Sequence, residues 1–185
     1  MLRAMIRVLA ATGLSALAFA ACVRQPQPAR LGLKLAPATL GESISLQQHL
    51  RVEREGRIDE LDVALEVDPD RLDMVGFVLG QRILTLHYDG RQLQSWRHPL
   101  VPEQLRGEDV LEDLQLTLWP ADVIRQALTD GWTLEESGRR RTLLLDAAPV
   151  MIIDYDSESR WNGKIELANL RYQYRLTIQS VANGP

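Results

Sequence analysis

The chain has 185 residues, of which 45% are hydrophobic and 25% charged, a composition typical of one folded domain and not of a disordered or collagen-like chain. Its formal net charge of -4 at pH 7 argues against a basic nucleic-acid-binding surface, and its aromatic content of 5% argues against a base-stacking platform. Because Cys22 is the only cysteine, neither an intrachain disulfide nor a cysteine-based zinc site is possible.

The N-terminus has the layout of a secretory signal peptide. Arg3 and Arg7 form a positive region before the apolar run 8–21, which is short for a membrane span. We therefore expect a signal peptide over residues 1–21. The run ends in Phe-Ala-Ala followed by Cys22, which resembles the lipobox of bacterial lipoproteins, where the cysteine thiol is acylated and its amine becomes the new N-terminus.

That resemblance implies lipidation at Cys22, and a multiply acylated N-terminus anchors a protein to a membrane. The next residue is Val23 and not aspartate, which by resemblance to lipoprotein sorting implies the outer membrane, with the domain facing the periplasm. The alternative is a plain exported protein, or a retained membrane anchor, with a coincidental cysteine. Residues 22–42 are expected to hold the lipidated cysteine and a flexible tether, because Pro26 and Pro28 lie among polar residues.

From Ser43 onward the sequence favours strands, because apolar residues recur at every second position. Over 61–67 leucine and valine alternate mainly with acidic residues, the pattern of a strand that is wet on one face. A turn at Asp-Pro-Asp precedes a predicted strand over 71–79. Gly80 interrupts this strand, and the next strand is predicted over 82–88.

Asp89-Gly90 lies between two alternating runs and predicts a β-hairpin. A two-residue loop at these positions pairs Tyr88 with Arg91 and Leu86 with Leu93. The apolar residues of both runs then share one face.

The apolar period changes after Pro102. Residues 108–118 suit a short amphipathic helix, with an extended conformation for 115–118 as the alternative. A second helix is expected to start at Pro120, where proline is tolerated, and to stop at Gly131. Later strands are predicted over 132–137, 141–146, 150–155, 164–170 and 172–180.

These elements predict a mainly β, α+β fold with about ten strands split five and five by two short helices. The absence of βαβ alternation argues against a parallel sheet. We expect one curled antiparallel sheet, an open half-barrel, formed by a domain over residues 43–185 with the helices as a lid.

Three segments resemble the LolA/LolB superfamily of periplasmic lipoprotein carriers and receptors. Residues 77–86, followed by Asp89-Gly90, resemble the LolB hairpin in which a Leu-Gly pair joins two strands. Residues 118–128 resemble its lid helix, and 161–167 with 175–178 resemble its closing strands. Their order resembles more closely a lipoprotein family encoded with aryl polyene pigment clusters in proteobacteria, over roughly residues 43–181.

The resemblance implies a barrel around a lipid-sized apolar cavity. The residues expected to line it are Leu61, Val63, Leu65, Leu84, Leu86, Trp119, Ile124, Tyr172, Tyr174, Leu176 and Ile178. The leucine that matches Leu79 in the LolB hairpin protrudes and promotes delivery of lipoproteins into the membrane. From the residues alone two alternatives stay open: a fully packed core gives the same alternation, and Leu79 could simply end a buried strand.

No catalytic motif is present: the sequence lacks a GxSxG elbow, a glycine-rich phosphate loop and an HExxH motif. We expect His49, His87 and His98 to be surface residues without a metal. The acidic residues in 154–158 are expected to form a solvated turn and not a calcium site. Arg139-Arg140-Arg141 is interpreted as a charged strand entrance, with contact to anionic headgroups as the alternative.

The sequence therefore predicts a non-enzymatic outer-membrane lipoprotein without cofactor or metal. Its expected partners are a lipid or acylated cargo, either lipoprotein acyl chains or an aryl polyene lipid, the outer membrane through its anchor, and a periplasmic LolA-like carrier. No nucleic-acid partner is expected. The alternative function is a structural envelope lipoprotein that scaffolds a protein assembly with a packed core.

Overall fold

The computed structural model describes residues 30–102 and 105–183, within which ten strands form one antiparallel sheet. Its order is β5-β4-β3-β2-β1-β10-β9-β8-β7-β6. Strands that are consecutive in the chain therefore pair, except β5 and β6, and the first strand also pairs with the last. The strands are β1 (Ile44–Arg54), β2 (Arg57–Val67), β3 (Leu72–Val78), β4 (Gln81–Tyr88), β5 (Leu93–Arg97), β6 (Trp132–Ser137), β7 (Arg140–Leu145), β8 (Ala148–Tyr155), β9 (Gly163–Asn169) and β10 (Tyr174–Ala182).

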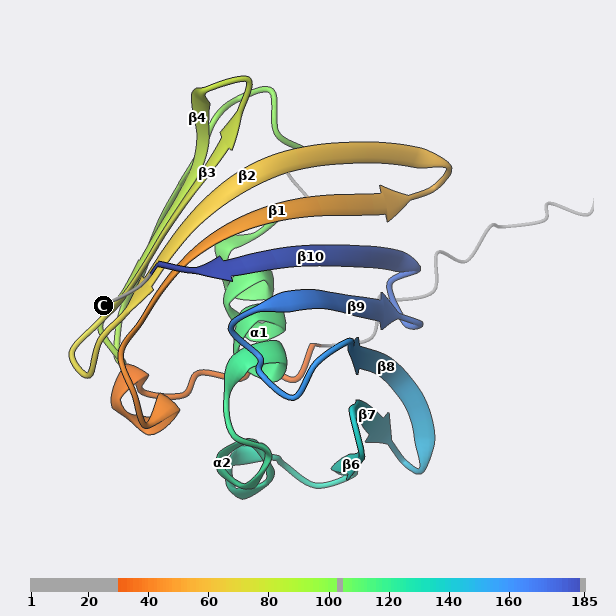
Figure 1. The fold of residues 1–185 in the computed structure, drawn as a ribbon. Coiled ribbons are helices and arrows are strands. Elements are labelled where there is room, and N and C mark those ends of the chain that lie inside the picture. The colour runs from red at the N-terminus through yellow and green to blue at the C-terminus, as the bar shows by residue number, and fades with distance from the viewer. Residues whose placement is uncertain (1–29, 103–104, 184–185) are drawn as a thin grey trace, which may run out of the picture.

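Two α-helices separate the two sets of five strands, as the sequence predicts. The helices are α1 (Gly107–Leu118) and α2 (Ala121–Ala127), and a short 3₁₀ helix, η1 (Pro37–Leu40), precedes β1. The sheet curves around α1 and leaves β5 and β6 as its two edges (Figure 1). The edge strands contact α1 and α2 respectively, and Arg125 of α2 donates from Nε to the carbonyl of Leu134 at 3.0 Å. The expected open half-barrel is therefore confirmed.

The hairpin after β4 differs from the predicted register. Tyr88 pairs with Leu93 and Leu86 with Ser95, so the loop has four residues instead of two. The Asp89 carboxylate accepts hydrogen bonds from the backbone N–H groups of Arg91 at 2.8 Å and Gln92 at 2.7 Å. Because the Asp89 side chain stabilises this turn, the loop is two residues longer than the predicted one. Because the shift is by two positions, the apolar residues still share one face.

The sequence predicts a flexible tether over residues 22–42, but residues 30–42 of this range belong to the folded domain. Leu33, Leu35 and Leu40 are buried in the core, and residues 30–35 run beside α1. We call residues 30–35 the strap. The domain boundary at residue 43 is therefore wrong, and the folded part includes residue 30. Cys22 and the predicted signal peptide lie outside the described residues.

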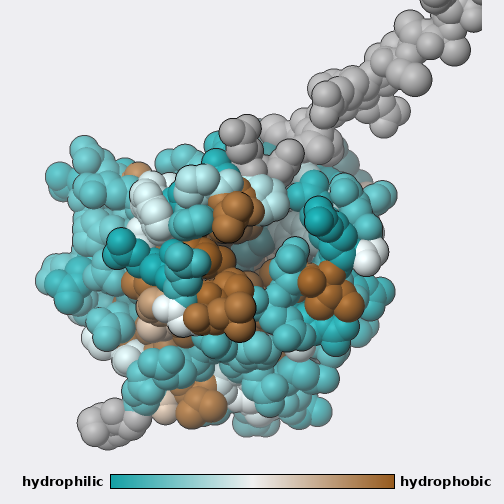
Figure 2. Space-filling view, turned by 90° about the horizontal axis from the view of Figure 1, so that it is seen from above, coloured by the Kyte–Doolittle hydropathy of each residue, from teal (hydrophilic) through white to brown (hydrophobic). Residues whose placement is uncertain are grey.

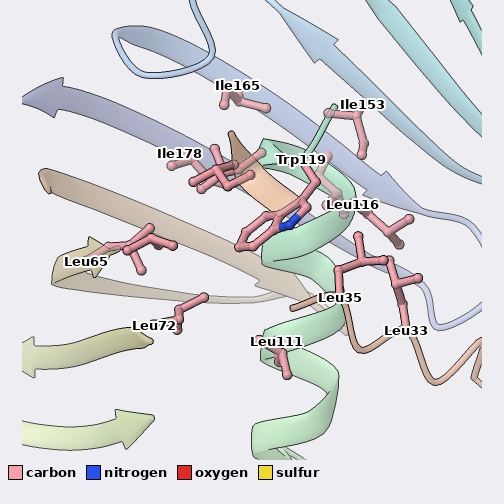
Figure 3. Packing of buried hydrophobic residues seen from close by; sticks show 14 of the residues in the cluster. Leu33, Leu35, Leu65, Leu72, Leu111, Leu116, Trp119, Ile153, Ile165 and Ile178 are labelled. Atoms are coloured by element: carbon pink, nitrogen blue, oxygen red, sulfur yellow. The ribbon is translucent and has the colours of Figure 1, made fainter. Parts of the chain in front are cut away.

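One hydrophobic core lies between the concave face of the sheet and the helices. Trp119, Leu111 and Leu116 project from α1 and its C-cap toward the sheet, and the strap leucines pack beside the same helix (Figure 3). Each strand contributes its alternate, inward-facing residues, which explains the period of two in the sequence. Within the described ranges, no helix combines the length and hydrophobicity needed to span a bilayer.

Candidate functional site

The residues predicted to line a cavity belong instead to the packed core or its margin. Those that are buried are Val63, Leu65, Leu84, Leu86, Trp119, Ile124 and Ile178, and those that are half-buried are Leu61, Tyr172, Tyr174 and Leu176. The core cluster includes the buried set, with α1 on the concave face of the sheet (Figure 3). The structure thus brings most of the predicted set together around α1.

An apolar area of the concave face is only partly covered. Leu50 pairs with Leu61 on β2 and with Ile178 on β10, and Val52 pairs with Leu176. Leu50, Leu61 and Leu176 pack against the core while staying partly exposed. We call these three residues the central leucines.

Side chains of α1 hold the strap by forming hydrogen bonds with its backbone, which in a sheet would bond to a neighbouring strand. Glu112 Oε2 accepts from the backbone N–H groups of Gly32 at 2.6 Å and Leu33 at 3.3 Å. Gln115 pairs with Leu35 in both directions, accepting from its N–H at 2.9 Å and donating to its carbonyl at 2.8 Å. These contacts satisfy backbone groups that have no sheet neighbour, and a buried backbone group without a partner is costly.

A charged cluster holds the start of the strap. Arg30 forms ion pairs with Asp109 at 3.0 Å and Asp113 at 3.2 Å, and its guanidinium lies 4.6 Å from the centre of the Tyr172 ring. The Tyr174 hydroxyl donates to the other oxygen of Asp113. Burial raises the pKa of Asp113 to about 6, although Arg30 and this hydrogen bond oppose the shift. Burial, followed by the Asp113 charge, raises the pKa of Tyr174.

Arg141 performs a similar role at the other end of α1. Its guanidinium is fully buried and donates from Nη1 to the carbonyls of Leu116 at 3.1 Å and Trp119 at 2.7 Å, while Nε pairs with Glu136 at 2.9 Å. A cation near the carbonyl end of a helix is favourable. Tyr155 donates to the Thr117 carbonyl at 2.6 Å, and burial raises its pKa to about 12. Arg140 and Arg141 do open a strand, β7, as the interpretation of a charged strand entrance has it, but Arg141 is buried against α1.

Leu79 lies at the tip of the β3–β4 hairpin and its side chain is fully exposed, at 101% of the reference area. The interpretation that Leu79 ends a buried strand is wrong. Leu79 and Gly80 both have positive φ, 50° and 75°, the type I′ geometry of a two-residue hairpin loop. Gly80 adopts this conformation freely. Leu79 is strained by it, because a leucine Cβ crowds the backbone there.

The sequence predicts that Tyr172 begins the last strand, but β10 begins at Tyr174, so Tyr172 lies outside it. The turn before it is formed by Asn169, whose side-chain oxygen accepts from the N–H groups of Arg171 at 3.2 Å and Tyr172 at 2.9 Å. Tyr172 therefore points to Arg30 from the turn.

The described residues hold a hollow of about 450 Å³ at the β1–β2 and β9–β10 turns. It is lined mainly by polar residues, among them Arg54, Arg57 and Arg175. Of the residues that the sequence predicts to line a cavity, only Tyr174 lines this hollow. Among residues 30–102 and 105–183, no group of three or more His, Cys, Asp or Glu side chains could hold a metal. His49 and His87 each contact one aspartate, Asp62 at 2.9 Å and Asp73 at 2.7 Å.

Several residues that organise α1 were not among the predicted site residues. Glu112, Gln115 and Arg141 are polar, and in the sequence they look like solvent-facing positions of a helix and a strand. Their partners lie far away in the chain, and no local pattern points to them. One signal was available: Leu31, Leu33 and Leu35 alternate with other residues before the first predicted strand, which indicates a segment with a buried face.

The sequence profile of one protein family, described as a protein of unknown function (DUF3261), matches residues 45–182. The chain belongs to this family. The DUF3261 match begins at the second residue of β1 and ends with β10, so it includes nearly the whole sheet and both α-helices but not the strap.

No curated protein matches this DUF3261 chain. Among solved structures it is similar to a LolA superfamily protein from Nitrosomonas europaea, with a TM-score of 0.43 and 9% sequence identity. The similarity covers 83% of the DUF3261 chain and 92% of the other chain.

Proposed function

We propose that this chain is a lipid-anchored outer-membrane lipoprotein that receives a lipid-like cargo from the periplasm and delivers it to the outer membrane. The observation that carries the proposal is the exposed Leu79. An apolar side chain in water on a strained backbone does not stabilise the folded domain. It is favourable where it meets an apolar partner, and burying a leucine fully gains about 1.5–3 kcal/mol.

The central leucines are the proposed contact surface for the cargo. They form a partly exposed apolar area on the concave face, next to an α1 whose two ends are held by polar contacts. Transfer needs no covalent step, because cargo moves toward the environment that buries more of its apolar surface. The cargo class, acyl chains of a lipoprotein or an aryl polyene lipid, comes from the resemblance of the three sequence segments, and a periplasmic LolA-like carrier is the proposed donor.

The anchor is tested by changing its only cysteine. We expect the native chain to fractionate with the outer membrane and the Cys22→Ala variant to stay soluble in the periplasm or as an uncleaved precursor. Recovery of both forms in the same fraction would contradict the lipoprotein assignment.

Cargo binding is tested by native mass spectrometry of the protein extracted from membranes in mild detergent. We expect a co-purifying lipid-like mass that is lost in Leu61→Asn, because an amide on the concave face disfavours an acyl chain. Ile58→Asn is the matched control, since Ile58 lies on the same strand and is 55% exposed. Equal loss in both variants, or no bound mass in the native protein, would contradict the proposed cargo site.

A second candidate function is a scaffold for an envelope assembly. The filled core favours it, since Trp119, Ile124 and Leu111 are completely buried around α1. A scaffold predicts no bound lipid and retention of a protein partner by the Leu61→Asn variant. The same purification therefore separates the two functions.

A further inference from the structure

Large exposed hydrophobic residues are concentrated in one corner of the sheet. Among residues 30–102 and 105–183, five of the eight such residues belong to the β3–β4 hairpin tip and to the neighbouring β5 with the residues after it: Val78, Leu79, Trp96, Leu100 and Leu105. We call these five residues the apolar corner. Leu100 is 85% exposed, and of the large hydrophobic residues that the structure describes only Leu79 is more exposed. Scattered single hydrophobic residues are normal on a protein surface, but a contiguous group marks an interaction site.

The two segments are neighbours because β4 pairs with β5. The pairing continues beyond β5, where the His98 N–H donates to the Ile83 carbonyl at 2.8 Å. Leu100 therefore follows the last paired residue at the same end of the sheet as Leu79. The β3–β4 turn is at the top of Figure 1, and the view from that side shows hydrophobic side chains gathered on this face (Figure 2).

Arginines surround the apolar corner. The Arg82 guanidinium lies 5.2 Å from the centre of the Trp96 ring, and Arg97 donates to the Val101 carbonyl. Arg106 lies 3.6 Å from the Glu108 carboxylate. Tryptophan and arginine beside aliphatic side chains are typical of the membrane interface, where the ring and the guanidinium stay at headgroup level while their apolar parts are buried.

The start of the described chain is tied to α1, the helix that follows this corner in the chain. Arg30 pairs with Asp109 in the first turn of α1, directly after Arg106, and Gly107 packs so tightly that a Cβ there would lie 2.7 Å from Ser95 of β5. Arg30 follows Cys22 by eight positions, a length that spans at most about 29 Å. An anchor at Cys22 thus keeps the apolar corner within reach of the bilayer.

We propose that the apolar corner is a membrane-docking surface whose occupant is the lipid bilayer, with Leu100 entering the hydrocarbon boundary beside Leu79. The proposal rests on the lipid anchor of the proposed function and adds a second inserted residue. Contact at two adjacent segments fixes the orientation of the domain, which a single protruding leucine does not. It turns the start of α1 toward the bilayer.

The test places an environment-sensitive fluorescent label at single positions of the full lipidated chain. Cys22 is the only native cysteine, so acylation leaves no free thiol, and Leu79→Cys, Leu100→Cys and Val181→Cys each supply one. Val181 is the matched control because it is apolar, 61% exposed and lies near the end of β10, paired with Gln47 at the start of β1. The proteins are reconstituted in phosphatidylethanolamine and phosphatidylglycerol vesicles with or without bromine-labelled acyl chains.

We expect brominated lipid to remove about half or more of the emission at positions 79 and 100, the depth of an interfacial segment, and to leave position 181 unchanged. Quenching at position 79 alone, or equal emission at positions 100 and 181, would overturn the docking surface while leaving the proposed function intact. Label uptake by the unsubstituted chain, or its absence from the vesicles, would overturn the anchor and the docking surface together.

Discussion

Leu79 combines full exposure with a backbone conformation that leucine disfavours. Glu55 and Gly56 in the β1–β2 turn have nearly the same geometry, with φ of 52° and 75°. The two hairpins therefore offer a comparison in which the turn is constant and only the side chain differs. Asparagine followed by glycine is the preferred pair for this turn.

We predict that Leu79→Asn stabilises the domain by about 1 kcal/mol through relief of left-handed strain. The melting temperature should rise by about 2–4 °C, while transfer of cargo from the protein to vesicles decreases because the inserting side chain is gone. Glu55→Asn should stabilise by a similar amount without affecting transfer. A lower melting temperature for Leu79→Asn, or unchanged transfer, would contradict the role of Leu79.

Asp113 should make the stability of the domain depend on pH. Its pKa of about 6 lies above the ordinary value of 3.8 because the carboxylate is buried beside Glu112, whose pKa is also raised by burial, while Arg30, Tyr174 and Asp109 complete the surroundings. Between these two pH values the folded state binds more protons than the unfolded state. The contribution of Asp113 to stability is therefore largest below pH 4 and decreases as the pH rises to 6.

We predict that Asp113→Asn removes a pH-dependent contribution of about 2 kcal/mol. The difference in unfolding free energy between the native protein and the variant, measured by urea denaturation, should favour the native protein more at pH 4.5 than at pH 7. Asp122→Asn, on the exposed side of α2, is the control and should leave the profile unchanged. The opposite slope would show that the ion pair with Arg30 dominates.

The strap depends on α1 for partners that a strand would normally supply. Gln115 is completely buried, and its amide satisfies both backbone groups of Leu35. Removing it leaves an N–H and a carbonyl without partners in the core.

Gln115→Ala should therefore lower the free energy of unfolding by about 2–4 kcal/mol and increase hydrogen exchange in residues 31–35. Gln126→Ala, at an exposed position of α2, should change neither quantity. Loss of stability without faster exchange in the strap would contradict this account, because it would place the effect elsewhere in the core.

Elements with a local cause were predictable from the sequence. The alternation over residues 61–67 predicted β2, and the Pro120 signal predicted α2, because burial of one face and proline geometry act within a few residues. The predicted register after β4 was wrong because hydrogen bonds to the Asp89 side chain stabilise a four-residue loop instead of a two-residue one. The strap and the buried roles of Glu112 and Arg141 depend on partners distant in the chain, which a periodic pattern does not encode.

At the scale of the whole molecule, β1 and β10 join two sets of consecutive hairpins. Leu46 pairs with Ala182 and Arg54 with Tyr174, so this is the sheet contact with the largest separation in sequence. Bringing such distant segments together has an entropic cost that the local hairpins avoid. We therefore expect the β1–β10 pair to form late in folding.

Ile178→Val tests the order of folding. Ile178 is buried on β10, and the variant should lose about 1 kcal/mol, mainly through faster unfolding, since late contacts are absent from the folding transition state. Ile153→Val, in the local β7–β8 hairpin, is the control and should slow folding. Slower folding in both variants would place β10 in the folding nucleus.

The pairing of the first and last strands has a consequence for a chain that emerges from a translocation channel with its N-terminus first. The strands β1 to β5 appear early, yet the outer edge of β1 has no partner until the nine residues of β10 arrive. An unpaired edge beside an uncovered apolar face is a template for aggregation. A chain that stops after β9 would leave this edge and face uncovered, and it should accumulate as aggregates.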